Sequence, residues 1–559
     1  VPIEPWTGVR DATSFGATPQ RGPVAEVTLI PEPSVPGDST LNVNVFTPRP
    51  GDPSARMPVL VYIHGGGYVS GSPASPWYDG ESFARRGVVT VVVSYRLGFD
   101  GFGLIEGAPS NRGVRDWLAA LEWVQREITA FGGDPDAVTI AGQSAGGGAV
   151  LTLLGMPAAQ HLFERVWALS PALGDVSLAR AENVAAQLAE LAGGPATRDG
   201  FASVDSDALI GLQQTVSERG GARLSGIRSL LDDGLPWGPL VDGDLLTTTT
   251  PESIASGVGA NKPLVVGSTD DEFTMITDDA RGKLRFVPAT VALGALGVGR
   301  PMRRGYLSDN AEQHRLGTAA LLGRYVSDKV FRSGVVRIAA ARGEAPTWVY
   351  RFSWASTRIG WACHCVDVPF WFDVLDRERV DALTGDDRPQ LLADAVHGAA
   401  SAFVRVGDPG WERWSAEPGR TRMPCVPRIR CRGSMSLCHT TTAPSSSRSM
   451  RASTGRNVAG RWCCGQLNST PPEIHGPVRP TRAVHATADS AVSIAIRLLF
   501  IVPPPGSSSL STIMSSLINS PDYAQYLIDE LDRYLEGPLS PQNVITEIRR
   551  HKSAIEGDM

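Results

Sequence analysis

The chain has 559 residues, 42% of them hydrophobic and 20% charged, and its formal net charge at pH 7 is −6. These values are typical of a globular protein large enough for one α/β domain plus an appendage, and the charge gives no indication of nucleic-acid binding. No stretch reaches the roughly 18 uninterrupted apolar residues of a transmembrane helix, so we expect no membrane partner.

Short apolar runs alternate with longer helical patterns from about residue 57 to residue 405. The runs predict strands buried on both faces at 57–65, 88–96, 136–142, 165–171, 262–268 and 347–353. Apolar residues at steps of three and four predict a helix over 112–131, which Gly132, Gly133 and Pro135 end. The alternation predicts an α/β fold with a mostly parallel central sheet flanked by helices.

A glycine-rich segment follows the first predicted strand. His64-Gly65-Gly66-Gly67 is similar to segments whose backbone N–H groups bind a substrate oxygen with no side chain in the way. A flexible surface turn and a phosphate loop are the alternatives, but no lysine follows the glycines as a P-loop requires. We expect the N–H groups of Gly66, Gly67 and Ala145 to form an oxyanion hole, and His64 to be part of the turn.

A G-x-S-x-G pattern stands between the third predicted strand and a helical pattern. It reads Gly142-Gln143-Ser144-Ala145-Gly146, and a bare pattern of this kind is also common in glycine-rich turns. The strand before it and the helix after it favour a sharp turn that projects the serine hydroxyl at the carboxyl end of the sheet. The helix N-terminus favours developing negative charge there. Ser144 is therefore the predicted nucleophile.

These motifs resemble those of the type B carboxylesterase family, which includes cholinesterases and bacterial para-nitrobenzyl esterases. The resemblance runs from Trp6 to about Met423 and includes WTGVRDATSFG, LNVNVFTP, NRGVRDWLAALEWVQREITAFGGDP with GQSAGGG, and VDGDLL with GSTDDEF. Thr40 stands where the family usually has a cysteine. The resemblance implies an α/β-hydrolase fold with eight or more strands, and ester hydrolysis.

A serine nucleophile needs a base and a carboxylate that orients the base. In α/β hydrolases the acid and then the histidine follow the serine along the chain. After the fifth predicted strand come three acids, Asp270, Asp271 and Glu272, and spacing does not choose among them. The resemblance points to Glu272, although Phe273 replaces the glycine that the family usually has next.

Three histidines lie between these acids and residue 423. His314 falls in a polar helical pattern and His397 in a helix of small residues, whereas His364 follows the last predicted strand and a loop, where the base should arrive. The segment HCVDVPFWF also resembles the family's histidine segment. His364 is therefore the predicted base. Asp367 is interpreted as a loop-capping carboxylate without a catalytic role.

Two cysteines flank this histidine, which raises the question of a metal or redox site. In an extended chain Cys363 and Cys365 would point away from the face of His364, and no other pair in this part of the chain has zinc-like spacing. We expect both cysteines to pack as small apolar residues, and a redox pair is the alternative. We expect no metal and no organic cofactor.

The two ends of the chain depart from the family pattern. The family normally has several tens of residues before the Trp6 segment, so we expect residues 1–423 to be an N-terminally truncated α/β-hydrolase domain. Residues 424–472 lack Asp, Glu and Lys. We expect 424–518 to be an irregular, low-complexity segment that is disordered or translated in a shifted frame, and 519–559 to form a small helical appendage.

Together these features predict a serine carboxylesterase that hydrolyses small-molecule esters through an acyl-enzyme intermediate. The alternative is a catalytically impaired or non-catalytic binding protein of the cholinesterase type. The sequence identifies neither the ester nor the oligomeric state. Trp77, Trp237, Trp361 and Phe370 are candidates to line a pocket, but aromatic residues near a site more often belong to the core. Five of the seven cysteines lie between 425 and 464 and no signal peptide is evident, which predicts a cytoplasmic location.

Overall fold

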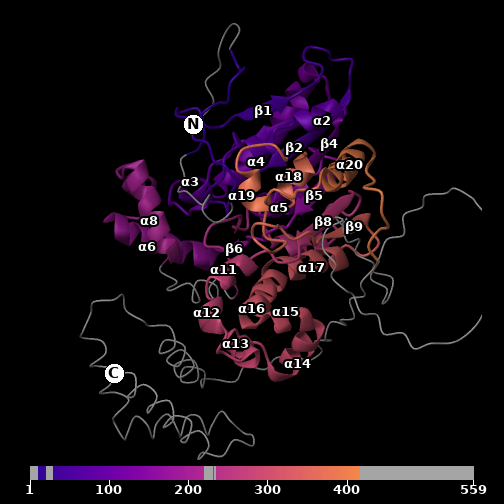
Figure 1. Ribbon diagram of the computed structural model, residues 1–559. Coiled ribbons are helices and arrows are strands. Elements are labelled where there is room, and N and C mark those ends of the chain that lie inside the picture. The colour runs from indigo at the N-terminus through magenta and orange to yellow at the C-terminus, as the bar shows by residue number, and fades with distance from the viewer. Residues whose placement is uncertain (1–10, 20–28, 219–230, 232–233, 416–559) are drawn as a thin grey trace, which may run out of the picture. The chain divides into compact units, whose positions relative to one another are not determined.

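The computed structural model describes residues 11–19, 29–218, 231 and 234–415 (Figure 1). The two predicted C-terminal segments, 424–518 and 519–559, lie outside these residues. Within the described ranges, no helix is long and apolar enough to cross a membrane.

A seven-stranded sheet forms the centre of the fold. Its strands, in spatial order, are β1 (Val43–Phe46), β3 (Val89–Val93), β2 (Met57–Ile63), β4 (Gly133–Gln143), β5 (Arg165–Leu169), β8 (Leu264–Thr269) and β9 (Thr347–Phe352). All six predicted strands are confirmed, and each pairs in parallel with its neighbours among them. Only β1 is antiparallel in this sheet, and β6 (Val176–Ser177) pairs with β7 (Leu240–Val241) in a separate two-stranded sheet. In the described residues the main sheet thus has one strand fewer than the eight implied by the resemblance.

The sheet is buried on both faces because alternate side chains of each strand enter different cores. On one face, residues such as Val61 and Ile140 pack with α4 (Arg112–Glu127), α5 (Ala145–Leu154) and α17 (Ser333–Ala341). On the other face, Leu60 and Ala141 belong to the core that includes α2 (Glu81–Arg85), α18 (Val368–Phe372) and α20 (Gln390–Val406). The result is the predicted three-layer α/β arrangement.

The predicted helix over 112–131 is confirmed as α4 followed by a 3₁₀ turn, η2 (Ile128–Phe131). It ends at Gly132, whose φ of 79° lies in the left-handed region that favours glycine. The shorter helices of the first half are η1 (Pro76–Tyr78), α3 (Gly98–Phe102), η3 (Pro157–Ala159), α6 (Leu178–Ala192), α7 (Arg198–Ala202), α8 (Ser206–Glu218) and α10 (Thr250–Ala255).

A helical insertion separates β8 from β9. It contains α11 (Thr274–Asp278), α12 (Arg281–Leu284), α13 (Ala289–Ala295), α14 (Arg300–Asp309), α15 (Ala311–Leu316), α16 (Thr318–Ser327) and the π-helix η4 (Asp328–Arg332), which leads into α17. Helices α11, α12, α13 and α15 pack on α16 (Figure 1). After β9 comes α19 (Val380–Thr384), between α18 and α20. The insertion places η4 beside the carboxyl end of the sheet, since η4 contacts β8.

Candidate active site

Ser144 sits on a strained turn between β4 and α5. Its φ of 58° and ψ of −119° lie outside the regions that most side chains adopt. The turn depends on two glycines: a Cβ at Gly146 would lie 1.9 Å from the Ile63 carbonyl oxygen, and one at Gly142 would lie 2.3 Å from the Gly146 oxygen. The Ser144 N–H donates to the Leu169 carbonyl at 3.0 Å. This geometry explains why the G-x-S-x-G pattern needs both glycines.

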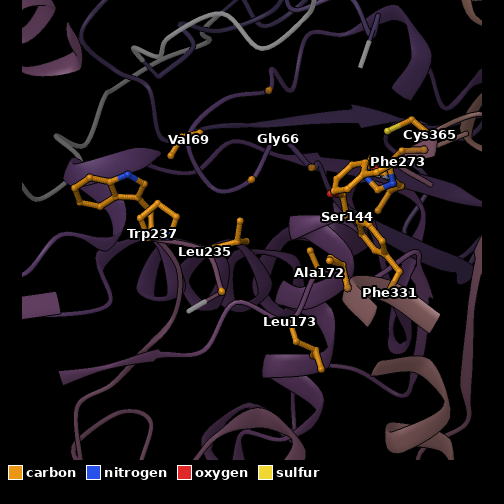
Figure 2. A pocket seen from close by; sticks show the side chains of 18 of the residues that line it. Gly66, Val69, Ser144, Ala172, Leu173, Leu235, Trp237, Phe273, Phe331 and Cys365 are labelled. Carbon is orange, nitrogen blue, oxygen red and sulfur yellow. Dashed lines mark hydrogen bonds between the residues drawn. The ribbon is translucent and has the colours of Figure 1, made fainter. Parts of the chain in front are cut away.

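Three backbone N–H groups near Ser144 have no acceptor among the described residues: those of Gly66, Gly67 and Ala145. The loop is held from its other side, because the Ser70 N–H and hydroxyl both donate to the Gly66 carbonyl at 3.0 Å. Gly66, Gly67 and Ser144 line the same cavity (Figure 2). These N–H groups could therefore receive an oxyanion.

A buried carboxylate holds the His364 ring. Glu272 and His364 are 0% and 4% exposed, and Glu272 Oε2 lies 2.5 Å from His364 Nδ1. The other oxygen, Oε1, accepts a hydrogen bond from the Thr269 N–H at 2.8 Å, and the His364 N–H donates to the Glu272 carbonyl at 2.9 Å. Because an ionised carboxylate only accepts hydrogen bonds, Nδ1 carries the proton and Nε2 is left toward the cavity.

The two other acids of this loop bind arginines instead. Asp270 forms an ion pair with Arg351, whose Nη2 lies 2.8 Å from Oδ2. Asp271 pairs with Arg324 at 2.8 Å, and both side chains are largely buried. Spacing alone left three candidates, and of these only Glu272 contacts His364. The Phe273 backbone has φ −115°, a value that needs no glycine, so the departure from the family at this position leaves the Glu272–His364 contact intact.

The electrostatic surroundings of His364 favour its charged form. Burial by itself would lower its pKa, but the neighbouring Cys365 thiol and Glu272 carboxylate outweigh burial, so the pKa of His364 lies well above its ordinary value. Burial and the nearby Glu272 carboxylate raise the pKa of Asp367 to about 7. The capping interpretation of Asp367 is wrong: it makes no side-chain cap and accepts a hydrogen bond from the Tyr350 hydroxyl at 3.3 Å.

Gln143 is a site residue that the sequence did not reveal. Its side-chain Nε2 lies 3.2 Å from His364 Nε2, whereas no hydrogen bond joins Ser144 Oγ to His364 in the described part of the chain. The motif gives the position of Gln143 in the chain but leaves its identity free. Its contact with a residue 221 positions away became visible only in the folded structure.

The other histidines and the two cysteines lie in different environments. His64 is buried in the turn, where its ring stacks on Tyr95 at 4.6 Å. His314 is exposed on α15, and His397 is buried, with Nδ1 2.9 Å from the Trp371 carbonyl oxygen. Cys363 and Cys365 are buried free thiols, and burial raises the pKa of Cys363. Within the described ranges, no group of three or more His, Cys, Asp or Glu could hold a metal ion.

The cavity beside Ser144 has a volume of about 730 Å³, which is within the usual range for small-ligand sites. Of the four aromatic candidates from the sequence, only Trp237 lines it. The other three, Trp77, Trp361 and Phe370, belong to the core on the α18–α20 face of the sheet, which was the alternative.

Two phenylalanines that the sequence did not predict as pocket residues, Phe273 and Phe331, line the cavity instead. We call them the aromatic wall. Their ring centroids lie 5.3 Å and 4.8 Å from that of His364, and 5.0 Å from each other. Phe331 belongs to the π-helix η4, a rare element that is frequent at functional sites. In Figure 2 the aromatic wall lies on the opposite side of the cavity from Trp237 and Leu235.

A mostly parallel sheet with a serine on the turn after its middle strand defines the serine hydrolases of the α/β-hydrolase fold. The chain belongs to the carboxylesterase family, whose family model matches residues 1–420. It is 31% identical to the para-nitrobenzyl esterase of Bacillus subtilis (strain 168), over 75% of this chain and 85% of that protein. It is 29% identical to the phenmedipham hydrolase of Pseudarthrobacter oxydans, over 72% of this chain and 82% of that protein.

Solved structures agree with these relatives. A thermophilic PNB esterase superposes with a TM-score of 0.60 at 28% identity, covering 73% of this chain and 83% of that one. A carboxylesterase of Geobacillus stearothermophilus gives a TM-score of 0.57 at 28% identity, covering 74% of this chain and 85% of that one. The predicted family and fold are confirmed, and the protein is a carboxylic ester hydrolase of the serine esterase type.

Proposed function

We propose that the protein hydrolyses small carboxylic esters through an acyl-enzyme intermediate, with Ser144 as nucleophile, His364 as base and Glu272 as the acid that orients it. Ser144 Oγ attacks the ester carbonyl carbon while His364 Nε2 takes the hydroxyl proton. The carbon–oxygen bond to the alcohol then breaks, and His364 returns the proton to the leaving oxygen. Water attacks the acyl-enzyme by the same proton transfers and releases the acid.

One observation carries this proposal: Ser144, His364 and the Gly66–Gly67 segment line one cavity. Glu272 binds His364 at Nδ1, the ring nitrogen that the reaction does not use. The N–H groups of Gly66, Gly67 and Ala145 would stabilise the negative oxygen of the tetrahedral intermediate, which typically contributes about 10²–10³ in rate for each donor. Glu272 would stabilise the imidazolium that forms when His364 is protonated. No hydrogen bond joins Ser144 to His364 in the described residues, and bonds between nucleophile and base often form fully only when substrate binds.

The proposed roles of the glycine N–H groups and of His364 determine how the substrate lies in the cavity. The carbonyl oxygen points to the Gly66 and Gly67 N–H groups, and the leaving oxygen must lie within reach of His364 Nε2. The alcohol part of the ester therefore lies against the aromatic wall, which contacts His364. The acyl chain then extends away from His364, toward Leu235 and Trp237 on the opposite side.

A covalent probe tests the proposal directly. An organophosphonate carrying a reporter group should modify Ser144, and peptide mapping by mass spectrometry should find the label on the peptide that contains it. Ser144→Ala should lose both the label and about 10⁴-fold or more of the activity on a chromogenic short-chain ester. An unchanged thermal melting curve would confirm that this variant is folded. Label on another residue, or substantial activity in Ser144→Ala, would refute the proposal.

A further inference from the structure

Gln143 places a buried side-chain amide directly beside the proposed base, His364. It is the last residue of β4, next to the proposed nucleophile, and the residue is only 1% exposed. Its backbone pairs with Leu169 on β5, which fixes the point from which the side chain starts. The sheet therefore fixes the backbone of Gln143, and the residue lines the cavity beside Ser144.

The amide makes its contact at the nitrogen that the reaction uses. His364 Nδ1 is bound to the Glu272 carboxylate, so Nε2 of the neutral ring is an acceptor. Gln143 Nε2 lies 3.2 Å from it and donates an N–H to its lone pair. The amide oxygen is turned the other way, since a Cβ at Gly65 would lie 3.0 Å from Gln143 Oε1. Gln143 thus lies between the base and the glycine loop.

The direction of this hydrogen bond matters for protonation. A donor at Nε2 favours the neutral ring, whereas the charged ring would place its own N–H against the amide N–H. The titratable groups facing His364 are Glu272 after β8, Cys365 beside it, and Asp367 before α18. Lys329 on η4 and Arg337 on α17 line the same cavity but are exposed to solvent, and the half-buried Glu32 lines it as well. Gln143, from β4, is the uncharged partner directly at Nε2.

We propose that Gln143 is a positioning residue for His364: its side-chain amide holds Nε2 in the resting enzyme and favours the neutral ring that can accept the Ser144 proton. The inference rests on the proposed function, since it matters only if His364 is the base. Because the amide offsets the carboxylate at Nδ1, it sets the pH at which the base becomes available. Ser144 Oγ must share or replace this hydrogen bond when substrate is bound.

The test compares pH profiles of kcat/KM on a chromogenic short-chain ester. Gln143→Glu keeps the shape of the side chain but places a carboxylate at Nε2, which stabilises the imidazolium. We expect the acidic limb to move up by about one pH unit or more, with kcat/KM at pH 7 at least about tenfold lower and recovering at alkaline pH. Gln143→Met, which only removes the donor, should move the limb in the same direction by less.

A matched control separates this local effect from a general change of charge. Gln187→Glu adds the same charge on α6, where Gln187 is half-buried and bonded to Asn183, and should leave the limb in place. An NMR titration of the His364 ring in each variant gives its pKa independently of turnover. If Gln143→Glu does not fold, the same two measurements on Gln143→Met decide the question.

Two results would overturn the inference. One is an acidic limb in Gln143→Glu or Gln143→Met that coincides with that of the parent. The other is a loss of kcat/KM by the same factor at every pH, which a merely structural residue would give. Phosphonate labelling of the parent is independent of both: label on Ser144 keeps the proposed function even if the inference fails, and label elsewhere removes both.

Discussion

Two parts of the cavity are built in different ways. The proposed catalytic groups stand at the carboxyl ends of parallel strands: Ser144 after β4, Glu272 after β8, and the glycine loop after β2. The aromatic wall faces them from the cap of α11 and from the π-helix η4 of the insertion. Backbone hydrogen bonds and glycines hold the strand-end groups, whereas ring contacts hold the wall. Substitutions among the first should therefore remove activity, and those in the wall should change selectivity.

We expect the largest loss of activity from a substitution of Glu272, and not of the adjacent acids. Glu272→Gln keeps the shape of the side chain but removes the negative charge that, in the proposed mechanism, fixes the His364 tautomer and stabilises its cation. We expect kcat to fall by about 10³–10⁴-fold with little change in KM. Steady-state kinetics on a chromogenic ester would measure the loss. A variant that kept more than about a tenth of the activity would show that Glu272 does not orient the base.

The next effect concerns the glycine loop. Gly66 has φ 115°, and a Cβ there would lie 2.2 Å from the Ser70 carbonyl oxygen, so Gly66→Ala must move its N–H. We expect kcat to fall by about 10²–10³-fold while the protein stays folded. Gly87→Ala is the matched control, because Gly87 also has a positive φ of 74° but an added Cβ there meets nothing within 4 Å. Equal losses in the two variants would mean that strain alone, and not the donor, explains the effect.

These strand-end groups were predictable from the sequence for a physical reason. A strand buried on both faces leaves a near-continuous apolar run, and a turn without room for a side chain requires glycine, so both constraints are visible in the residues. The sequence constrained the proposed triad acid less, because Asp270, Asp271 and Glu272 are equivalent by spacing. The choice among them depends on where Arg324 and Arg351 lie, and these arginines are 53 and 81 residues away from their partners.

Asp271 should behave unlike Glu272, although it precedes it directly. It forms a largely buried ion pair with Arg324, and removing one partner leaves the other charge uncompensated. We expect Asp271→Asn to lower the free energy of unfolding by about 3 kcal/mol. Activity per folded molecule should stay within a few-fold of the parent. Urea denaturation and active-site titration measure the two quantities, and a large loss of kcat without loss of stability would contradict the distinction.

The aromatic wall was not predictable in the same way. Phe331 belongs to an insertion with no motif, and its approach to His364 depends on how η4 continues α16 into α17. Phe273 was visible only as a departure from the family's usual glycine. Conversely, Trp77, Trp361 and Phe370 are aromatic, as pocket residues often are, but they are buried in the core. An aromatic residue near a site motif does not indicate which side of the sheet it faces.

The smallest expected effect is a change in selectivity when the aromatic wall is altered, in contrast to the loss of activity expected at the strand ends. Phe273→Gly should keep turnover but change the choice of alcohol, because the proposed orientation places the leaving group against this ring. Benzyl and cyclohexylmethyl esters of one acid have similar leaving groups, and only the first is flat and aromatic. We expect the parent to favour the benzyl ester by about three- to tenfold in kcat/KM, and Phe273→Gly to bring the ratio close to one.

The acyl side provides the control for this last measurement. Leu235 lines the cavity on the opposite side from Phe273, so Leu235→Ala should change the ratio between benzyl acetate and benzyl hexanoate but not the ratio between the two alcohols. Phe273→Leu keeps apolar volume without the ring and should lose most of the preference for the benzyl ester. If Phe273→Gly changed the acyl ratio instead, the ester would lie in the cavity in the reverse direction, and His364 could not protonate the leaving oxygen from where it stands.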